Sequence, residues 1–141
     1  MKYAVAYYTR SGNTKKIAET IAEVLGVTPF DIADGMSEKA DVLFLGSSLY
    51  AFTYDPAVEK FIQDNAESIG QIVSFSTSAS GKSTAKFVKE TAEKCGIKFY
   101  PHAYKCYGKF GILNPYRPGE KDFVQARVFA KSVVADLGDP S

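Results

Sequence analysis

The sequence of 141 residues contains few of the residues that form disulfides, bind metals or cross membranes. It has two cysteines, Cys95 and Cys106, one histidine, His102, and no tryptophan. Two cysteines are too few for a disulfide-built mini-domain, and one histidine with no Cys/His pair nearby does not make a zinc site. No apolar run approaches the roughly 18 residues of a membrane span, so no membrane insertion is expected. The apolar stretch from Tyr3 to Tyr8 is expected to be a strand rather than a secretion signal.

Composition and charge exclude further classes. The chain is 45% hydrophobic with a net charge of +1, so it can bury a core and is not disordered. We expect one domain, residues 1–141, in the cytoplasm. Residues 1–80 carry 6 Lys/Arg and 10 Asp/Glu, whereas residues 81–141 carry 11 and 6. This asymmetry fits either a mixed solvated surface or a basic face for an anionic partner. No interleaving of aromatic and basic residues indicates nucleic-acid binding.

Short apolar runs alternate with amphipathic helical segments along the chain. This order predicts an α/β, doubly wound fold: a five-stranded, mostly parallel sheet with helices on both faces. In such sheets ligands bind outside the carboxyl ends of the strands, which directs attention to the loops that follow them. Strands are expected at residues 2–8, 27–32, 41–46 and 71–75, an extended irregular segment at 97–107, and helices at 13–25, from 55–56, from 80 or 81, and at 120–137.

The segment TRSGNT, residues 9–14, lies between the first expected strand and the first expected helix. It places three hydroxyls and a side-chain amide within six residues, and Gly12 permits a tight turn. The N–H groups at a helix start point back at such a loop, and the helix dipole favours an anion there. The pattern fits either a phosphate-binding loop or simple capping, because Ser, Asn and Thr are common at helix starts.

This run, after KYAVAYY and before KKIAETIAEVL, resembles the phosphate loop of flavodoxin-like proteins. That family binds flavin mononucleotide (FMN) non-covalently, and its pattern at this position is T/S-x-S/T-G-N-T. All five constrained positions match. Gly108-Lys109-Phe110, followed by a proline-containing approach to the last helix, resembles the closing segment of a short subgroup of the family. The resemblance covers about residues 2–137 and implies the flavodoxin-like fold.

The resemblance also implies where FMN would lie, with its phosphate in the first loop and its ring between the loops after the third and fourth strands. In the family the loop after the third strand often supplies an aromatic that stacks on the isoalloxazine ring. Tyr50 matches that aromatic by position, with Phe52 and Tyr54 as close alternatives. The implied cofactor-binding residues are Thr9, Arg10, Ser11, Gly12, Asn13, Thr14, Ser48, Leu49, Tyr50, Ala51, Phe52, Thr77, Ser78, Ala79 and Gly81.

Other chemistry has less support in the sequence. Gly81-Lys82-Ser83 ends a Walker A-like pattern, but Ser76 stands where that pattern needs its first glycine. The sequence has no G-x-S-x-G elbow for a Ser–His–Asp triad, and no acidic cluster follows the first strand, as a phosphoacceptor receiver domain requires. Cys95 lies on the apolar side of an expected helix and is expected to be inert packing. We therefore assign no catalytic residue and no metal site.

The leading hypothesis is an FMN protein that carries electrons between redox partners, with a partner protein docking over the exposed flavin edge, rather than a stand-alone oxidoreductase. One alternative is a small NAD(P)H-dependent flavin or quinone reductase, in which Arg10, Lys82 or Lys109 would hold the nucleotide phosphates. Another is a flavin-free binding or regulatory module on the same fold. The chain departs from the family pattern in its near-neutral charge, since flavodoxins are usually strongly acidic, and in its lack of tryptophan. It also lacks a long insertion in the last strand, which argues against the longer quinone reductases.

Overall fold

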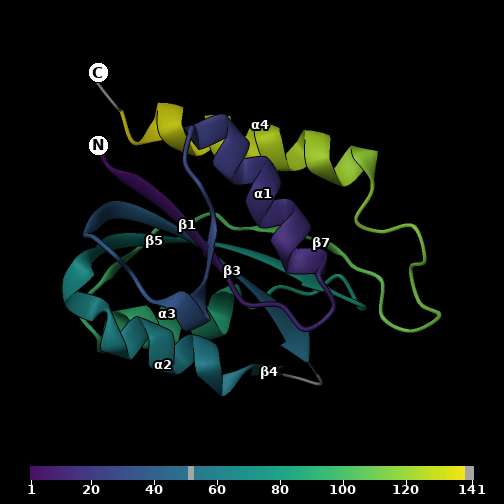
Figure 1. The fold of residues 1–141 in the computed structure, drawn as a ribbon, viewed down its shortest axis with the longest axis horizontal. Coiled ribbons are helices and arrows are strands. Elements are labelled where there is room, and N and C mark those ends of the chain that lie inside the picture. The colour runs from purple at the N-terminus through teal and green to yellow at the C-terminus, as the bar shows by residue number, and fades with distance from the viewer. Residues whose placement is uncertain (51–52, 139–141) are drawn as a thin grey trace.

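The structure, a computed structural model, describes residues 1–50 and 53–138. A central sheet separates two layers of helices, with α1 and α4 on one face and α2 and α3 on the other (Figure 1). The elements in chain order are β1 (Tyr3–Tyr7), α1 (Asn13–Leu25), β2 (Phe30–Asp31), the 3-10 turn η1 (Ile32–Asp34), β3 (Ala40–Tyr50), β4 (Thr53–Tyr54), α2 (Pro56–Asp64), the 3-10 turn η2 (Ala66–Ser68), β5 (Ile69–Ser78), α3 (Ala85–Lys94), β6 (Lys98–Phe99), β7 (Tyr104–Tyr107) and α4 (Glu120–Asp136).

The sheet has five parallel positions, as the sequence predicts, and their order is β2-β1-β3-β5-β6. The fifth position is one interrupted strand, because β6 pairs with Gln71–Ile72 and β7 pairs with Phe75–Ser78 of the same strand β5. The strand order reverses direction between β1 and β3, which is the switch point where open α/β sheets bind ligands. Among the strands of the described residues, β4 alone runs antiparallel, against the end of β3.

Two apolar cores, one on each face, hold these layers together. On one face Ile17, Ile21 and Ala130 of α1 and α4 pack against sheet residues that include Phe44 and Phe75. On the other face Val58 and Phe61 of α2, with Val88 of α3, pack against Leu43, Leu45 and Ile72. The central parts of β3 and β5 are buried on both faces, which explains why the segments 42–45 and 72–73 are apolar without alternation.

Four expected elements differ from the structure. The second strand is only Phe30–Asp31, because Pro29 has no N–H to donate and the Asp31 side chain accepts from Ala33 N–H (2.9 Å) to start η1. Strands β3 and β5 extend through the polar residues expected to form loops. The third helix begins at Ala85 rather than Ser80 or Gly81.

Candidate functional site at the carboxyl edge of the sheet

The first loop is folded around the start of α1. Gly12 has φ 88° and is the N-cap residue, a left-handed conformation that favours glycine. Its N–H donates to Thr9 Oγ1 (2.9 Å), which closes the loop on itself. The Asn13 side-chain amide donates to Ser11 Oγ (2.9 Å) and to the Lys109 carbonyl (2.8 Å). Both amide hydrogens of Asn13 are therefore used within the protein, and this residue shapes the loop.

The start of α1 faces a pocket of about 370 Å³ with a positive lining. No side chain caps this helix and its first turn contains no acidic residue. The first-turn N–H groups of an α-helix have no acceptor within the helix, so they are available to donate to a ligand. Besides the loop residues Ser11 and Asn13, the pocket is lined by Lys16, Lys109, Pro115, Tyr116, Arg117 and Pro118. The lining suits an anion that accepts several hydrogen bonds.

Thr14, Ser48 and Thr77 form a triangle of buried hydroxyls beneath this loop. Thr14 Oγ1 lies 2.8 Å from Ser48 Oγ and 2.9 Å from Thr77 Oγ1, and these two oxygens are 3.2 Å apart. Three hydroxyl hydrogens can satisfy three hydrogen bonds within the triangle. The first helix is thus joined by hydrogen bonds to the ends of β3 and β5.

We expect Thr14→Val to lower the free energy of unfolding by about 1–2 kcal/mol, because it removes two buried hydrogen bonds while conserving side-chain shape. Thr20→Val is the matched control on the same helix, since the Thr20 hydroxyl only donates back to the Lys16 carbonyl (3.0 Å). That bond, one turn earlier in the helix, adds little, so we expect a change below about 0.5 kcal/mol. Urea unfolding of both variants measures the difference, and equal losses would contradict a bridging role for Thr14.

Polar residues after the fourth expected strand extend β5 and delay α3. Ser76, Thr77 and Ser78 continue β5 because they pair with β7, and Ser76 and Thr77 also pair with β3. Ser78 Oγ donates to the Lys82 carbonyl (2.8 Å) and Ser83 Oγ accepts from Ala85 N–H (3.0 Å). These local bonds hold residues 79–84 outside the helix, which is why α3 starts later than predicted.

The second expected loop is largely strand. Ser47 and Ser48 pair with Ser76 and Thr77, and β3 continues to Tyr50 before β4 pairs back. Ser47 Oγ lies 2.6 Å from Thr84 Oγ1, on the face of the sheet opposite the hydroxyl triangle. The buried hydroxyls of Ser47 and Ser48 near the end of β3 therefore both have hydrogen-bond partners. Leu49 is half-buried beside β4. Ala51 and Phe52, together with the side chain of Tyr50, lie outside the described residues, so the expected stacking aromatic stays a prediction.

The guanidinium of Arg10 points to the start of α2 and forms an ion pair with Asp55. Asp55 is the N-cap of α2, where its side chain accepts from Ala57 N–H (2.9 Å), and it also accepts from the Tyr8 hydroxyl (3.1 Å). The Ala57 amide, together with hydrogen bonds from Arg10 and Tyr8, holds the pKa of Asp55 below its usual value despite partial desolvation. Arg10, which the sequence predicts as a cofactor ligand, is therefore paired with a carboxylate of the protein itself.

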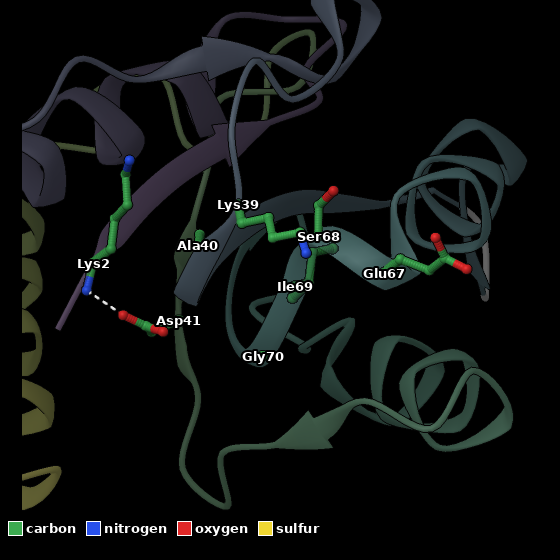
Figure 2. Close-up of a pocket in the computed structure, with 8 residues that line it drawn as sticks. All are labelled: Lys2, Lys39, Ala40, Asp41, Glu67, Ser68, Ile69 and Gly70. Atoms are coloured by element: carbon green, nitrogen blue, oxygen red, sulfur yellow. Dashed lines mark hydrogen bonds between the residues drawn. The ribbon is translucent and has the colours of Figure 1, made fainter.

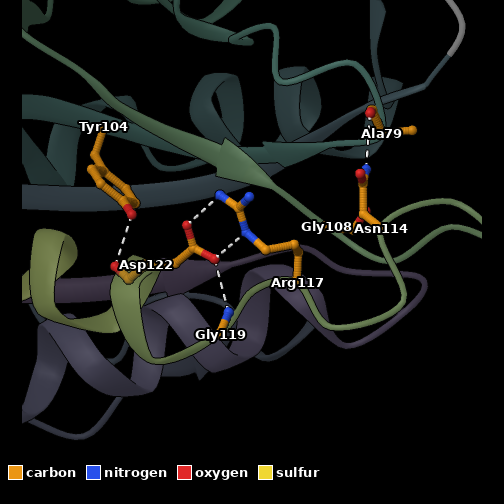
Figure 3. A network of polar contacts seen from close by, with 7 residues as sticks. All are labelled: Ala79, Tyr104, Gly108, Asn114, Arg117, Gly119 and Asp122. Atoms are coloured by element: carbon orange, nitrogen blue, oxygen red, sulfur yellow. Dashed lines mark hydrogen bonds and ion pairs between the residues drawn. The ribbon is translucent and has the colours of Figure 1, made fainter.

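The loop between β7 and α4 is fixed by a polar network that the sequence reasoning missed (Figure 3). Arg117 donates from Nε and Nη2 to the two carboxylate oxygens of Asp122, each at 2.7 Å, and Gly119 N–H donates to the same carboxylate (2.8 Å). Asn114 donates to the carbonyls of Ala79 (3.0 Å) and Gly108 (3.1 Å). Gly119 has no side chain to complete a capping box, but an acid three residues after the N-cap residue is the other half of that helix-start signal and could have identified Asp122.

Tyr107, at the end of β7, packs between this loop and the loop after β5. A Cβ on Gly81, where φ is 76°, would lie 2.8 Å from the Tyr107 ring, so glycine is required there. The Arg117 guanidinium lies 5.1 Å from the centroid of the same ring, in a cation–π contact. Beside them is a pocket of about 340 Å³ that Lys82, Lys105 and Arg117 help to line. Two of the predicted ligands after β5 therefore have partners within the protein. Gly81 lies against the Tyr107 ring, and the Ala79 carbonyl accepts a hydrogen bond from Asn114.

A further pocket lies apart from this site, at the opposite edge of the sheet. Figure 2 shows a pocket of about 420 Å³ at the amino-terminal edge of the sheet, lined by acidic and basic residues, where Lys2 N–H donates to Asp41 (2.6 Å).

Burial raises the pKa of the Cys106 thiol to about 12, so it is protonated at neutral pH and unreactive. Cys95 is half-buried against the α2–α3 core. No helix in the described part of the chain is long and apolar enough to cross a membrane.

Most of this chain matches a known family. The family described as "Flavodoxin domain" matches residues 4–103, more than half of the chain. This chain belongs to the flavodoxin domain family. An uncharacterized protein of Methanocaldococcus jannaschii is 29% identical to this flavodoxin-domain protein over 135 residues, which cover 86% of this chain and 90% of that one.

Solved flavodoxins share the fold of this flavodoxin-domain protein over nearly its whole length. A flavodoxin from the domain Archaea has a TM-score of 0.78 at 20% identity, covering 97% of this chain and 99% of its own. Flavodoxin 1 of Bacillus cereus has a TM-score of 0.72 at 20% identity, covering 96% and 98%. The flavodoxin of Fusobacterium nucleatum bound to FMN has a TM-score of 0.68 at 15% identity, covering 96% and 99%. At these identities the likeness shows the fold alone.

Proposed function

We propose that this protein binds FMN non-covalently at the carboxyl edge of its sheet and carries electrons between redox partners. The observation that carries this proposal is the uncapped start of α1, which faces a pocket lined by Lys16, Lys109 and Arg117. A phosphate there would meet backbone N–H groups, hydroxyls and positive charge together. Membership of the flavodoxin family and the FMN-bound structure from Fusobacterium nucleatum support the choice of cofactor.

The hydrogen bonds within the loop indicate which groups would hold the phosphate. Thr9 and Ser11 each accept a hydrogen bond through oxygen, which leaves their own hydroxyl hydrogens able to donate to a ligand. Asn13 and Thr14 already use their side chains within the protein. We therefore assign phosphate binding to the backbone N–H groups of residues 13–15 and to the Thr9 and Ser11 hydroxyls, because the Gly12 N–H already donates to Thr9. Asn13 and Thr14 shape the loop and anchor it.

The flavin ring would lie between the end of β3 and the loop after β5, beside residues 48–52 and 77–81. FMN, when bound, supplies a ring that accepts and releases electrons, and the protein holds it and sets its potential. In this chain Ser48 and Thr77 bond to each other and to Thr14, so their hydroxyls fix the floor of the site. The contact that Gly81 makes with Tyr107 keeps the loop after β5 close to β7.

Ser11→Ala is expected to weaken FMN binding about tenfold or more, because it removes one hydrogen bond to a charged phosphate, about 1.5–3 kcal/mol. Riboflavin has no phosphate, so its affinity should change less than about twofold in the same variant, because the Lys109 carbonyl still holds Asn13 once its bond to Ser11 is lost. Ser37→Ala, an exposed serine remote from the site, is the control. Quenching of flavin fluorescence measures all three affinities. Equal loss for FMN and riboflavin would indicate damage to the loop rather than a lost phosphate contact.

Steady-state kinetics separate the carrier from the reductase alternative. The FMN-loaded protein, mixed with NADH or NADPH and a quinone, should oxidise neither nucleotide at an appreciable rate unless a separate reductase is added. Rapid oxidation by the protein alone would assign the reductase function. A protein that stays colourless after incubation with FMN and washing would instead support the flavin-free module.

A further inference from the structure

The loop between β7 and α4 exposes apolar side chains next to the candidate site. Among the large apolar residues that are exposed in the described part of the chain, four of seven belong to residues 107–116. Ile112 is 94% exposed, Tyr116 88%, Leu113 55% and Tyr107 41%. We call these four residues the apolar loop patch. In Figure 1 their loop extends beyond the sheet at the right.

The apolar loop patch is held in place by bonds on both sides. Phe110 and Leu113 exchange two backbone hydrogen bonds (3.1 and 3.0 Å), so Gly111 and Ile112 form the tip of a tight turn. The Asn114 and Arg117 side chains anchor the rest of the loop to Ala79, Gly108 and Asp122 (Figure 3). Exposing isoleucine and tyrosine to solvent on an ordered loop does not stabilise the fold, which points to an interaction surface.

Positive charge surrounds this patch. The two pockets that flank the loop are lined by five basic side chains and by one acid, Asp122, which Arg117 already neutralises. We call the four lysines the basic rim: Lys16, Lys82, Lys105 and Lys109. An apolar centre rich in Tyr and aliphatic residues, inside a charged rim, is the usual anatomy of a transient protein interface.

We propose that the apolar loop patch and basic rim form the docking surface for an acidic electron-carrier protein. This inference rests on the proposed function, because the patch adjoins the loops assigned to FMN and a partner seated there would be close to the flavin. The basic rim favours carboxylates on the partner, and electrostatic attraction of this kind raises association rates at low salt. A lipid surface would also attract lysines, but a small patch anchored beside a redox site fits a protein better than a bilayer.

The test measures binding of an acidic [2Fe–2S] ferredoxin by calorimetry, with basic cytochrome c as the opposite-charge probe. Raising salt from about 20 to about 300 mM should weaken ferredoxin binding at least tenfold. The double variant Lys82→Glu/Lys105→Glu should weaken it about tenfold at low salt. Its control is Lys89→Glu/Lys131→Glu, which makes the same charge change on exposed faces of α3 and α4.

A second pair of variants tests how much the apolar loop patch contributes to ferredoxin binding. Ile112→Asn should weaken ferredoxin binding about fivefold without altering its salt dependence, whereas Val128→Asn, at a 62% exposed position on α4, should not change it. Equal unfolding midpoints for all variants would show that folding is unaffected. Tighter binding to cytochrome c, no effect of Lys82→Glu/Lys105→Glu, or co-sedimentation with phosphatidylglycerol vesicles that Ile112→Asn abolishes would each overturn the proposal.

The failure of this proposal can be distinguished from failure of the FMN assignment. FMN affinity is titrated separately, and ferredoxin binding is measured with and without added FMN. Normal FMN affinity with no ferredoxin binding would reject the docking surface alone. Charge-dependent ferredoxin binding without FMN affinity would reject the cofactor assignment while retaining the surface.

Discussion

Replacing Gly46 with alanine is expected to lower the free energy of unfolding by roughly 3 kcal/mol, at the upper end for overpacked cores. Gly46 is buried in β3, two residues before Ser48 of the hydroxyl triangle. A Cβ at this position would overlap the ring of Phe75, which is fully buried, and would lie 2.8 Å from Thr14 Cγ2. The overlap cannot be relieved locally, because Phe75 is enclosed in the core between the sheet, α1 and α4.

Gly26→Ala is the matched control for this substitution. Gly26 ends α1 with φ 70°, and a Cβ there would meet no atom within 4 Å. Its expected cost, about 1 kcal/mol, is therefore backbone strain without a clash. Urea unfolding with far-UV circular dichroism measures both variants. If Gly46→Ala costs no more than Gly26→Ala, β3 and α1 can move apart more easily than the packing indicates.

The parts of the fold set by local sequence were predictable. The expected helix at residues 13–25 has those bounds in the structure, since its apolar spacing and Gly26 define both the buried face and the end. Asp55 and Pro56 also begin α2 as expected, through an N-cap hydrogen bond to Ala57. In both cases the signals lie within a few residues of the helix end, where capping and propensity decide the conformation.

The parts set by distant partners could not be predicted in this way. Ser47, Ser48 and Ser76–Ser78 are typical loop residues, yet they are buried strand, because Thr14 and Thr84 satisfy hydroxyls among them from other elements. Asn114 likewise bonds to Ala79, 35 residues earlier in the chain. Residue types alone do not contain these pairings, so the sequence analysis located the loops of the candidate site without their internal bonds.

The second substitution with a large expected effect is Asp122→Ala. We expect it to lower the free energy of unfolding by about 2–3 kcal/mol at neutral pH. The Asp122 side chain is 1% exposed and accepts hydrogen bonds from Arg117 and Gly119. Arg117 is 39% exposed, so water can partly solvate it once the carboxylate is gone. The loss is therefore smaller than for a fully buried pair.

The control for this ion pair is Asp64→Asn, which breaks the exposed pair of Asp64 with Lys60 on α2 and should cost less than about 0.5 kcal/mol.

A pH series tests the electrostatic origin of the Asp122 effect. Burial alone would raise the pKa of Asp122, but the bonds from Arg117 and Gly119 outweigh it and hold that pKa below its usual value. The stabilisation is thus complete above the unfolded-state pKa of about 3.9 and is lost as pH falls through the lower folded value. The stability difference between wild type and Asp122→Ala should therefore shrink only under acid. A difference that is unchanged at acid pH would assign the effect to lost packing instead.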